Sequence, residues 1–342
     1  FPVPEQRLDP TKPINFQILP VDFPNVRASN SPKVDFGQVI SEMTAFWESQ
    51  SSTGMKISFD IPDAYLKLDK PVESFGMNGG LSDFQGDKYW SFIQLVIDQW
   101  AAKISFKNVN VIAVVVPPAV TKLQIGTWIV NTDTVFQTPE GKMYNTLITG
   151  NGSSITDLST WAHEFGHTCG MTDMRYVSST RTVQQPDGLG IFDLMASGGA
   201  APETIIWNRF LTGMISNNQI HCITKSDAST HWLRPVEGNG SGLKGAVIPL
   251  SKTKAIVMES RRSFGYDSVL NQSSEGVLVY EVDTTVPYHQ SPVHIIPAAE
   301  SLDRVWNTDS ALHVNQSITY SGWKISVIES GDFGDVVQVI HL

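Results

Sequence analysis

The chain has 342 residues, of which 41% are hydrophobic, 10% aromatic and 17% charged, a composition typical of a globular protein with a large core. Its 34 acidic residues outnumber its 24 basic residues, and the resulting net charge of −10 argues against nucleic acid and anionic membranes as main partners. The longest apolar run, at about residues 109–116, is far too short to span a bilayer.

The first half of the chain alternates predicted strands with predicted helices. Alternating polar and apolar residues, or short β-branched runs, predict strands at residues 14–19, 55–61, 110–116, 123–131 and 144–149. Apolar residues at helical spacing predict helices at 36–49 and 84–102. Residues 110–116 are nearly all Val, Ile and Ala, which is typical of a central strand that is buried on both faces. This order predicts an α/β fold with a mixed sheet, in which an edge strand at 122–131 or 144–151 would pair with an extended peptide.

The most informative stretch runs from His163 to Asp173 and has the pattern His-Glu-x-x-His-x-x-Gly-x-x-Asp. A helix turns about 100° per residue, so His163 and His167 lie one turn apart and their imidazoles reach one point. Two imidazoles at this spacing suit a zinc ion, and the flanking Glu164 is placed to act on a water there as general base. Gly170 can end the helix, because glycine adopts the left-handed conformation at low cost, and the turned chain then brings Asp173 to the metal as a third ligand.

Three protein ligands leave the fourth position of a tetrahedral zinc ion open to water, which is the arrangement of a catalytic site rather than a structural one. A chance His pair on a solvent-facing helix is the simpler interpretation of the first five positions alone, but the added Gly and Asp at fixed offsets disfavour it. We expect the helix to occupy residues 155–169 and to begin after Ser153-Ser154 with a Ser or Thr hydroxyl as its cap. Its apolar positions should pack on the sheet; they are Leu158, Trp161, Ala162 and Phe165.

Residues 192–199 form a tight apolar turn in the sequence, and residues 202–215 have the apolar spacing of another helix. Asp193, inside the turn, is expected to hydrogen-bond the backbone or groups around the site rather than to bind the metal. From about residue 230 the pattern changes to short β-rich segments, with strands predicted at 255–259, 276–283, 317–320, 324–329 and 336–342. We therefore expect an α/β catalytic domain, which carries the His163–Asp173 motif, at residues 1–228 and an antiparallel β-sandwich domain at residues 229–342.

Two further features leave alternatives open. Cys169 and Cys222 are compatible with a disulfide or with two buried thiols. Calcium is a second candidate cofactor with no site assigned, since the EF-hand spacing is absent around the aspartates considered for it, which are Asp60, Asp63, Asp83 and Asp87.

The extended motif, followed by Asp-Leu-Met-Ala-Ser-Gly at 193–198, resembles metzincin metallopeptidases that use an aspartate as third ligand. More closely, the chain resembles the immune inhibitor A-like family of secreted bacterial zinc metallopeptidases. The resemblance covers most of residues 14–285 and is carried by the segments 16–25, 36–61, 190–199, 258–262 and 276–283. The sequence departs from the family in having Met-Thr-Asp-Met-Arg around Asp173 where Leu-Pro-Asp-Leu-Tyr is usual, and Phe192 where Trp is usual.

The resemblance implies a secreted, extracellular zinc metalloendopeptidase that hydrolyses peptide bonds in a protein or peptide substrate. Residue by residue, it implies that His163, His167 and Asp173 are the zinc ligands and that Glu164 is the general base. It also implies that Met195 is the methionine of a turn beneath the metal, where it packs and does not bind. We expect a monomer with no nucleic-acid partner and no membrane span.

A non-catalytic binding or adhesion protein on a protease-like fold is the alternative function. Glu164 argues against it, because a metal that is kept only for structure needs its ligands and not a general base.

Overall fold

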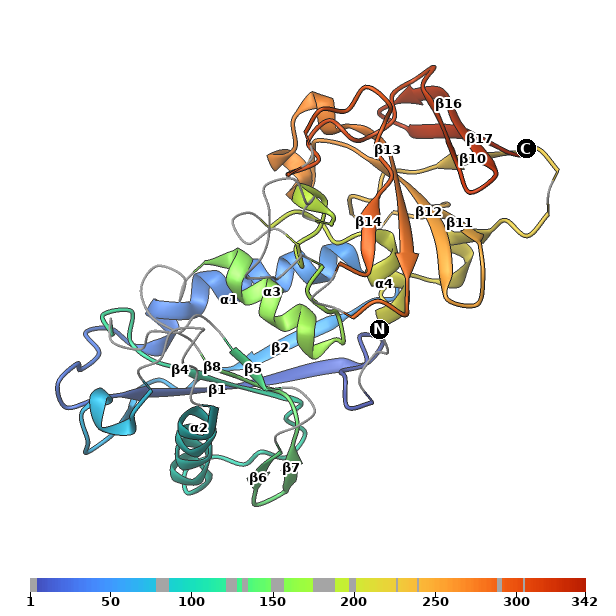
Figure 1. The fold of residues 1–342 in the computed structure, drawn as a ribbon. Helices are drawn as coiled ribbons and strands as arrows, with labels where there is room; N and C mark the ends of the chain where they lie inside the picture. The colour runs from blue at the N-terminus through green and yellow to red at the C-terminus, as the bar shows by residue number, and fades with distance from the viewer. Residues whose placement is uncertain are drawn as a thin grey trace. The chain divides into compact units, whose positions relative to one another are not determined.

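The computed structural model describes the chain in segments (Figure 1), which are residues 5–77, 86–120, 135–148, 157–174, 188–196, 201–225, 227–238, 240–287, 291–303 and 305–342, with the backbone of 128–130. The chain forms two compact units. The N-terminal unit comprises Pro4–Glu48 and Met55–Gly170, and the C-terminal unit comprises Phe1–Val3, Ser49–Gly54 and Met171–Leu342. The expected domain division after residue 228 stays a prediction.

The architecture is mixed α/β, as predicted, with a largely parallel sheet in one unit and antiparallel sheets in the other. Among the described helices, none combines the length and the apolar character that a membrane crossing requires.

The sheet of the N-terminal unit has the strand order β2-β1-β4-β8-β5, with β3 also paired to β1. Its strands are β1 (Pro13–Asp22), β2 (Lys56–Asp60), β3 (Leu66–Lys67), β4 (Val111–Val115), β5 (Trp128–Val130) and β8 (Thr146–Ile148). All paired strands are parallel except β5, which runs antiparallel to β8 at an edge of the sheet. Every residue of the internal strand β4 is buried, as its unbroken apolar run predicted. Each of the five strands predicted for this part of the chain has a counterpart, although residues 123–127 and 131 of the strand predicted at 123–131, and residue 149, lie outside the described residues.

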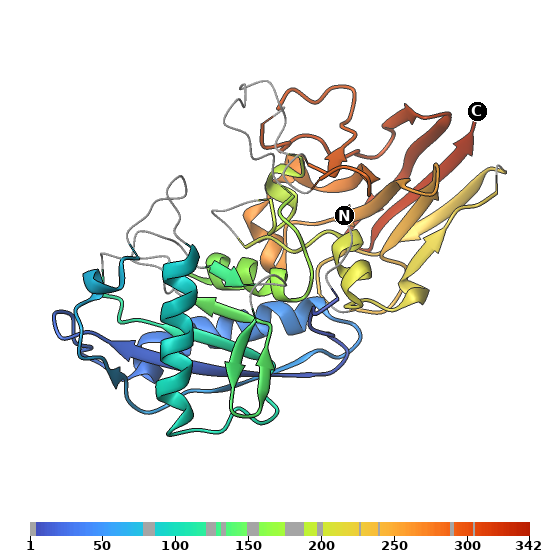
Figure 2. The same ribbon diagram turned by 60° about the horizontal axis from the view of Figure 1, so that its bottom comes forward.

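Helices cover both faces of this sheet. Figures 1 and 2 show α2 (Gly86–Ala101) on one face and α1 (Pro32–Gln50) with α3 (Leu158–Thr168) on the other. Both α1 and α2 bury the apolar residues whose helical spacing predicted them. On the α2 face, the ring of Phe92 stacks on Phe23 at the end of β1, with 6.0 Å between centroids. The unit also contains a hairpin that was not predicted, formed by β6 (Phe136–Thr138) and β7 (Gly141–Met143).

The C-terminal unit holds two further sheets, with strand orders β14-β13-β12-β11-β9 and β10-β17-β16-β15. The strands of the first sheet are β9 (Ile220–Cys222), β11 (Gly245–Pro249), β12 (Lys254–Arg261), β13 (Gly276–Asp283) and β14 (Val293–Ile295). Those of the second are β10 (Ser229–Leu233), β15 (Ser317–Tyr320), β16 (Trp323–Gly331) and β17 (Gly334–His341). All pairs are antiparallel except β9 with β11. One hydrophobic cluster takes residues from both sheets, among them Met258 of β12 and Val337 of β17.

The five strands predicted after residue 250 are present, whereas β9, β10, β11 and β14 were not predicted. These four have three to five residues each, too few for an alternating pattern to stand out. Short 3₁₀ helices complete the described elements, at Val72–Phe75, Gly190–Phe192, Asn217–Gln219, Gly265–Val269 and Gln272–Ser274.

The helix predicted at 202–215 is shorter than expected: α4 spans Ile206–Thr212. Side chains distant in sequence accept hydrogen bonds from the N–H groups of the three residues before it. Gln50 binds Thr204, Asp193 binds Ile205, and Asp267 binds the residue before them, Glu203. The helix ends where Gly213 takes a left-handed φ of 80°.

Candidate metal centre

The helix α3 begins with a carboxylate cap. The Asp157 side chain accepts hydrogen bonds from the Thr160 N–H at 3.2 Å and from the Thr160 hydroxyl at 3.1 Å, and it also binds the Ser159 hydroxyl. The prediction of a hydroxyl cap after Ser153-Ser154 was therefore wrong. A carboxylate at this position satisfies free N–H groups and also meets the positive end of the helix dipole.

Aromatic contacts fix the rotation of α3. Phe165 lies between the ring of Phe16 on β1 and the ring of Trp47 on α1, each 5.5 Å away between centroids. Trp161 lies 6.1 Å from Phe36 of α1, and both Trp161 and Phe165 are fully buried. Because successive residues turn by about 100°, a helix that buries positions 161, 162 and 165 turns positions 163, 164 and 167 the other way. His163, Glu164 and His167 are accordingly half-buried.

The end of α3 turns the chain as predicted. Cys169 caps the helix, and Gly170 follows with a left-handed φ of 94°. The Gly170 N–H donates to the carbonyl of His167 at 2.8 Å, which satisfies one of the last free carbonyls of the helix. The chain then leaves the helix axis and reaches Asp173 three residues later.

Three side chains of this stretch come together. One potential ligand atom each from His163, His167 and Asp173 lies within 4.8 Å of the other two. The two imidazole rings are nearly perpendicular, at 86°, with 4.9 Å between centroids. In the part of the chain that the structure describes, no other group of His, Cys, Asp and Glu side chains meets this criterion.

The donor set fits a zinc ion. Two ligand atoms that each lie about 2.0–2.1 Å from a tetrahedral zinc are roughly 3.3 Å apart, so small side-chain rotations close the group around one ion. Two imidazoles and one carboxylate are donors that zinc accepts, and they provide three of its four positions. Glu164 is half-buried on the same helix, beside His163, and is outside the group of three.

Met195 lies in a buried turn that is bonded to the residue after Asp173. The Met174 N–H donates to the carbonyl of Met195 at 3.0 Å, and the side chains of both methionines are fully buried. The expected role of Met195 beneath the metal stays a prediction, but its backbone is joined directly to the segment that carries the third ligand.

Asp193 makes the contacts expected of it. Its carboxylate accepts hydrogen bonds from the Met195 N–H at 2.6 Å, from the Ile205 N–H at 2.7 Å and from the Asn208 side-chain amide at 3.1 Å. Burial raises its pKa to about 6, although these donors and the charge of Arg261 favour the ionised form.

A buried ionic cluster in the C-terminal unit was not predicted. The Arg261 guanidinium, with no exposed surface, donates to Glu259 at 2.9 Å, pairs with Asp267 at 2.5 Å and lies 3.8 Å from Glu237. A second buried pair joins Arg209 to Glu203. Burial raises the pKa of Glu203 and raises that of Glu237 well above its usual value, and the charge of Asp267 adds to both shifts.

No local pattern could have revealed this cluster. Glu203 and Asp267 are 64 positions apart and yet hydrogen-bonded, and a single buried acidic residue looks like an exposed one in the sequence. One available signal was the Glu-Ser-Arg sequence at 259–261, which ends a strand whose preceding residues are apolar.

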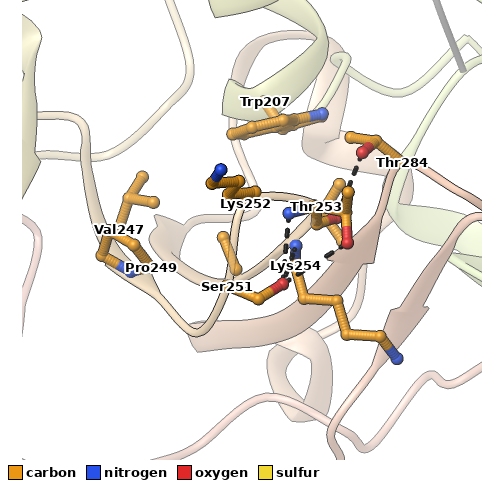
Figure 3. A pocket seen from close by; sticks show the side chains of 10 residues that line it. Trp207, Val247, Pro249, Ser251, Lys252, Thr253, Lys254 and Thr284 are labelled. Atoms are coloured by element: carbon orange, nitrogen blue, oxygen red, sulfur yellow. Dashed lines mark hydrogen bonds between the residues drawn. The ribbon is translucent and has the colours of Figure 1, made fainter.

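The remaining candidates lie elsewhere. Both cysteines are free: Cys169 is buried, which raises its pKa to about 12, and Cys222 is exposed. Of the aspartates considered for calcium, Asp63 pairs with Lys33 at 2.8 Å, and Asp83 lies outside the described residues. A surface pocket of the C-terminal unit is roofed by Trp207 over Lys252, Ser251 and Thr253 (Figure 3). None of the three grouped ligands lines it.

Compared with models of known protein families and with curated proteins, the chain shows no match. The interpretation of the site therefore depends on its own residues.

Proposed function

We propose that this protein is a zinc-dependent endopeptidase, with His163, His167 and Asp173 as metal ligands and Glu164 as general base. The observation that carries the proposal is the grouping of those three donors within 4.8 Å, with a carboxylate next to the first of them in the helix. Three protein ligands rather than four are the mark of a catalytic zinc site. A purely structural site would have no use for the half-buried Glu164.

The residues have distinct tasks. The two histidines and Asp173 would hold the zinc, which supplies a water of lowered pKa and polarises the scissile carbonyl. Glu164 accepts the proton from the attacking water at its carboxylate and then donates that proton to the leaving amine. The apolar contacts of Phe165 and Trp161 support this chemistry, because they hold α3 at one rotation and so keep the imidazoles and Glu164 on the same side.

The edge strand β5 is the proposed substrate platform. It packs against α3, pairs with β8 on one side and has its other edge unpaired within the described strands of this sheet. An extended peptide added to such an edge gains main-chain hydrogen bonds that do not depend on its sequence. This platform would bring a peptide to the helix that carries Glu164.

The finer fold assignment belongs to the same proposal. A parallel sheet with an active-site helix supports a metzincin-like catalytic domain, and two antiparallel sheets that share one hydrophobic cluster support a β-sandwich after it. We propose a secreted, extracellular enzyme on the basis of the resemblance to the immune inhibitor A-like peptidases.

Cleavage of a denatured protein, with the cut sites mapped by mass spectrometry, tests the proposal. We expect internal cuts with zinc, none with a chelator, and a loss of at least about a thousandfold in turnover for Glu164→Gln with zinc still bound. Glu42→Gln is the matched control, since that carboxylate lies on α1 and accepts only from Gln38 among the described contacts. A folded, zinc-loaded wild type that makes no cuts, or a Glu164→Gln variant as active as wild type, would refute the proposal. The first of these results would favour a binding protein.

A further inference from the structure

We propose that Asp193 is a positioning residue whose buried carboxylate sets the place of the third metal ligand, Asp173. The inference rests on the proposed metal centre. Its basis is a short chain of hydrogen bonds: Asp193 accepts from the Met195 N–H at 2.6 Å, and the Met195 carbonyl accepts from the Met174 N–H at 3.0 Å. Met174 is the residue directly after Asp173, so a shift of the turn moves the ligand.

The segment after Asp173 is held from a second direction as well. The Ser291 hydroxyl lies 3.4 Å from the Met174 carbonyl and 2.9 Å from that of Val293, at the start of β14. A Cβ at Gly188, whose φ is 52°, would lie only 2.4 Å from the Met174 carbonyl. Backbone packs this closely only where a side chain is absent, so the position of Met174 is tightly defined.

Asp193 is itself anchored at its other oxygen. That oxygen accepts from the Ile205 N–H at 2.7 Å and from the Asn208 amide at 3.1 Å, both at the start of α4. One carboxylate therefore joins the turn to the helix through three donors.

The start of α4 is fixed in turn by the sheet. Glu259 of β12 accepts from the Ile206 N–H at 2.8 Å and from the Tyr280 hydroxyl of β13 at 2.8 Å. Arg261, which pairs with Glu259, lies over the ring of Phe192 at 5.7 Å, directly before Asp193. The turn is thus connected, through Asp193 and the start of α4, to the middle strand of a five-stranded sheet.

A carboxylate is needed at this position because N–H donors face both of its oxygens. Asparagine has nearly the same shape but offers one acceptor oxygen and one NH₂ group. In Asp193→Asn, the NH₂ group must face either Met195 N–H or the pair of donors on α4, so one side of the link is lost. Groups that orient metal ligands in this way typically change metal affinity by about 10- to 100-fold when they are mutated.

The test is a titration of the metal-free protein with Co²⁺, followed by visible absorption, which reports both affinity and coordination geometry. We expect Asp193→Asn to weaken Co²⁺ binding by about 10- to 100-fold and to alter the absorption band. Asp335→Asn is the matched control, because Asp335 is an equally buried carboxylate of the same unit that binds Ser260 and Arg262 instead. It should lower the stability of the fold and leave Co²⁺ affinity unchanged.

The outcomes separate this inference from the proposed function. If wild type does not bind Co²⁺, or if His163→Ala binds it equally well, the metal centre itself is refuted. If wild type binds through His163 and Asp193→Asn matches it in affinity and spectrum, or if Asp335→Asn weakens binding as much, only the positioning role is refuted.

A second measurement needs no variant and covers the case in which Asp193→Asn does not fold. Hydrogen exchange of wild type should show the Met174 and Met195 amides protected in metal-free protein, since the network holds them without metal. Protection that appears only when metal is added would overturn the inference.

Discussion

The two units are ordered by different kinds of contact. In the N-terminal unit, α3 is positioned by aromatic rings, with Phe165 between Phe16 and Trp47. In the C-terminal unit, the turn before Met195 and the start of α4 are positioned by buried carboxylates. Aromatic contacts are non-directional and require only side chains that fill the space between the elements. Hydrogen bonds to buried carboxylates require each donor to meet its acceptor.

This difference has consequences for tolerance to mutation. An apolar contact survives replacement by a residue of similar volume, at a modest cost in stability. A buried charge that loses its partner keeps the full cost of its desolvation. We therefore expect the C-terminal unit to be the more fragile of the two, although both contain large apolar cores.

The largest effect should come from Arg261→Met. The substitution keeps most of the volume but leaves Glu259 and Asp267 without the cation that they share. We expect the free energy of unfolding to fall by about 3–5 kcal/mol, measured by chemical denaturation. Lys33→Met is the control, since Lys33 and Asp63 form an exposed pair and its loss should not be measurable. Equal effects of the two substitutions would contradict the comparison between the units.

A smaller effect is expected for Phe165→Leu in the N-terminal unit. The change removes two aromatic contacts but keeps an apolar side chain on the buried face of α3. We expect a loss of about 1–2 kcal/mol in the free energy of unfolding and a detectable fall in metal affinity as α3 adjusts. A loss larger than that of Arg261→Met would reverse the proposed order of the two units.

The pH dependence of stability sharpens the comparison further. Burial raises the pKa of Glu203 and Glu237, and it raises that of Asp193 to about 6. As the pH rises above about 4, these groups therefore hold more protons in the folded chain than in the unfolded chain. Stability from these groups is therefore fully present near pH 4 and is lost as the pH rises through their folded pKa values. Hydrogen bonds act oppositely on Asp303 and outweigh its burial, lowering its pKa to about 2, so its contribution is lost as the pH falls from about 4 to 2.

Glu237→Gln isolates one of these groups. Glutamine keeps the carbonyl that accepts from the Arg262 N–H at 2.8 Å and removes the titrating proton. We expect unfolding midpoints equal to those of wild type at pH 5 and higher than wild type at pH 8. An unchanged difference across this range would show that Glu237 does not titrate as its burial requires.

The smallest effect is expected at the cap of α3. Asp157→Ala leaves the Thr160 N–H without its side-chain acceptor and should cost about 1 kcal/mol. Asp157→Asn keeps an acceptor oxygen and should cost much less, so the pair of variants distinguishes loss of the cap from loss of the charge. Thermal unfolding of both variants measures the difference, and an alanine variant as stable as wild type would exclude a capping role.

The predictions of secondary structure were correct where a hydrophobic pattern is repeated over many residues. The strand β4 and the helices α1 and α2 lie within a few residues of their predicted positions, because burial imposes a period that the sequence must carry. The predictions were wrong at ends set by distant partners. The helix α4 begins at Ile206 rather than at 202, and Asp193 and Gln50 accept hydrogen bonds from the N–H groups of the two residues before it.

The sequence by itself determined the grouping of His163, His167 and Asp173. One helical turn separates the histidines, and Gly170 reverses the chain three residues before the aspartate, so the geometry follows from local rules alone. Only the tertiary structure decided which strands are neighbours and which carboxylates pair with Arg261. It also decided that Asp193 joins the Met195 turn to α4. These contacts link residues far apart in the chain, and a hydrogen bond between them leaves no periodic trace in either segment.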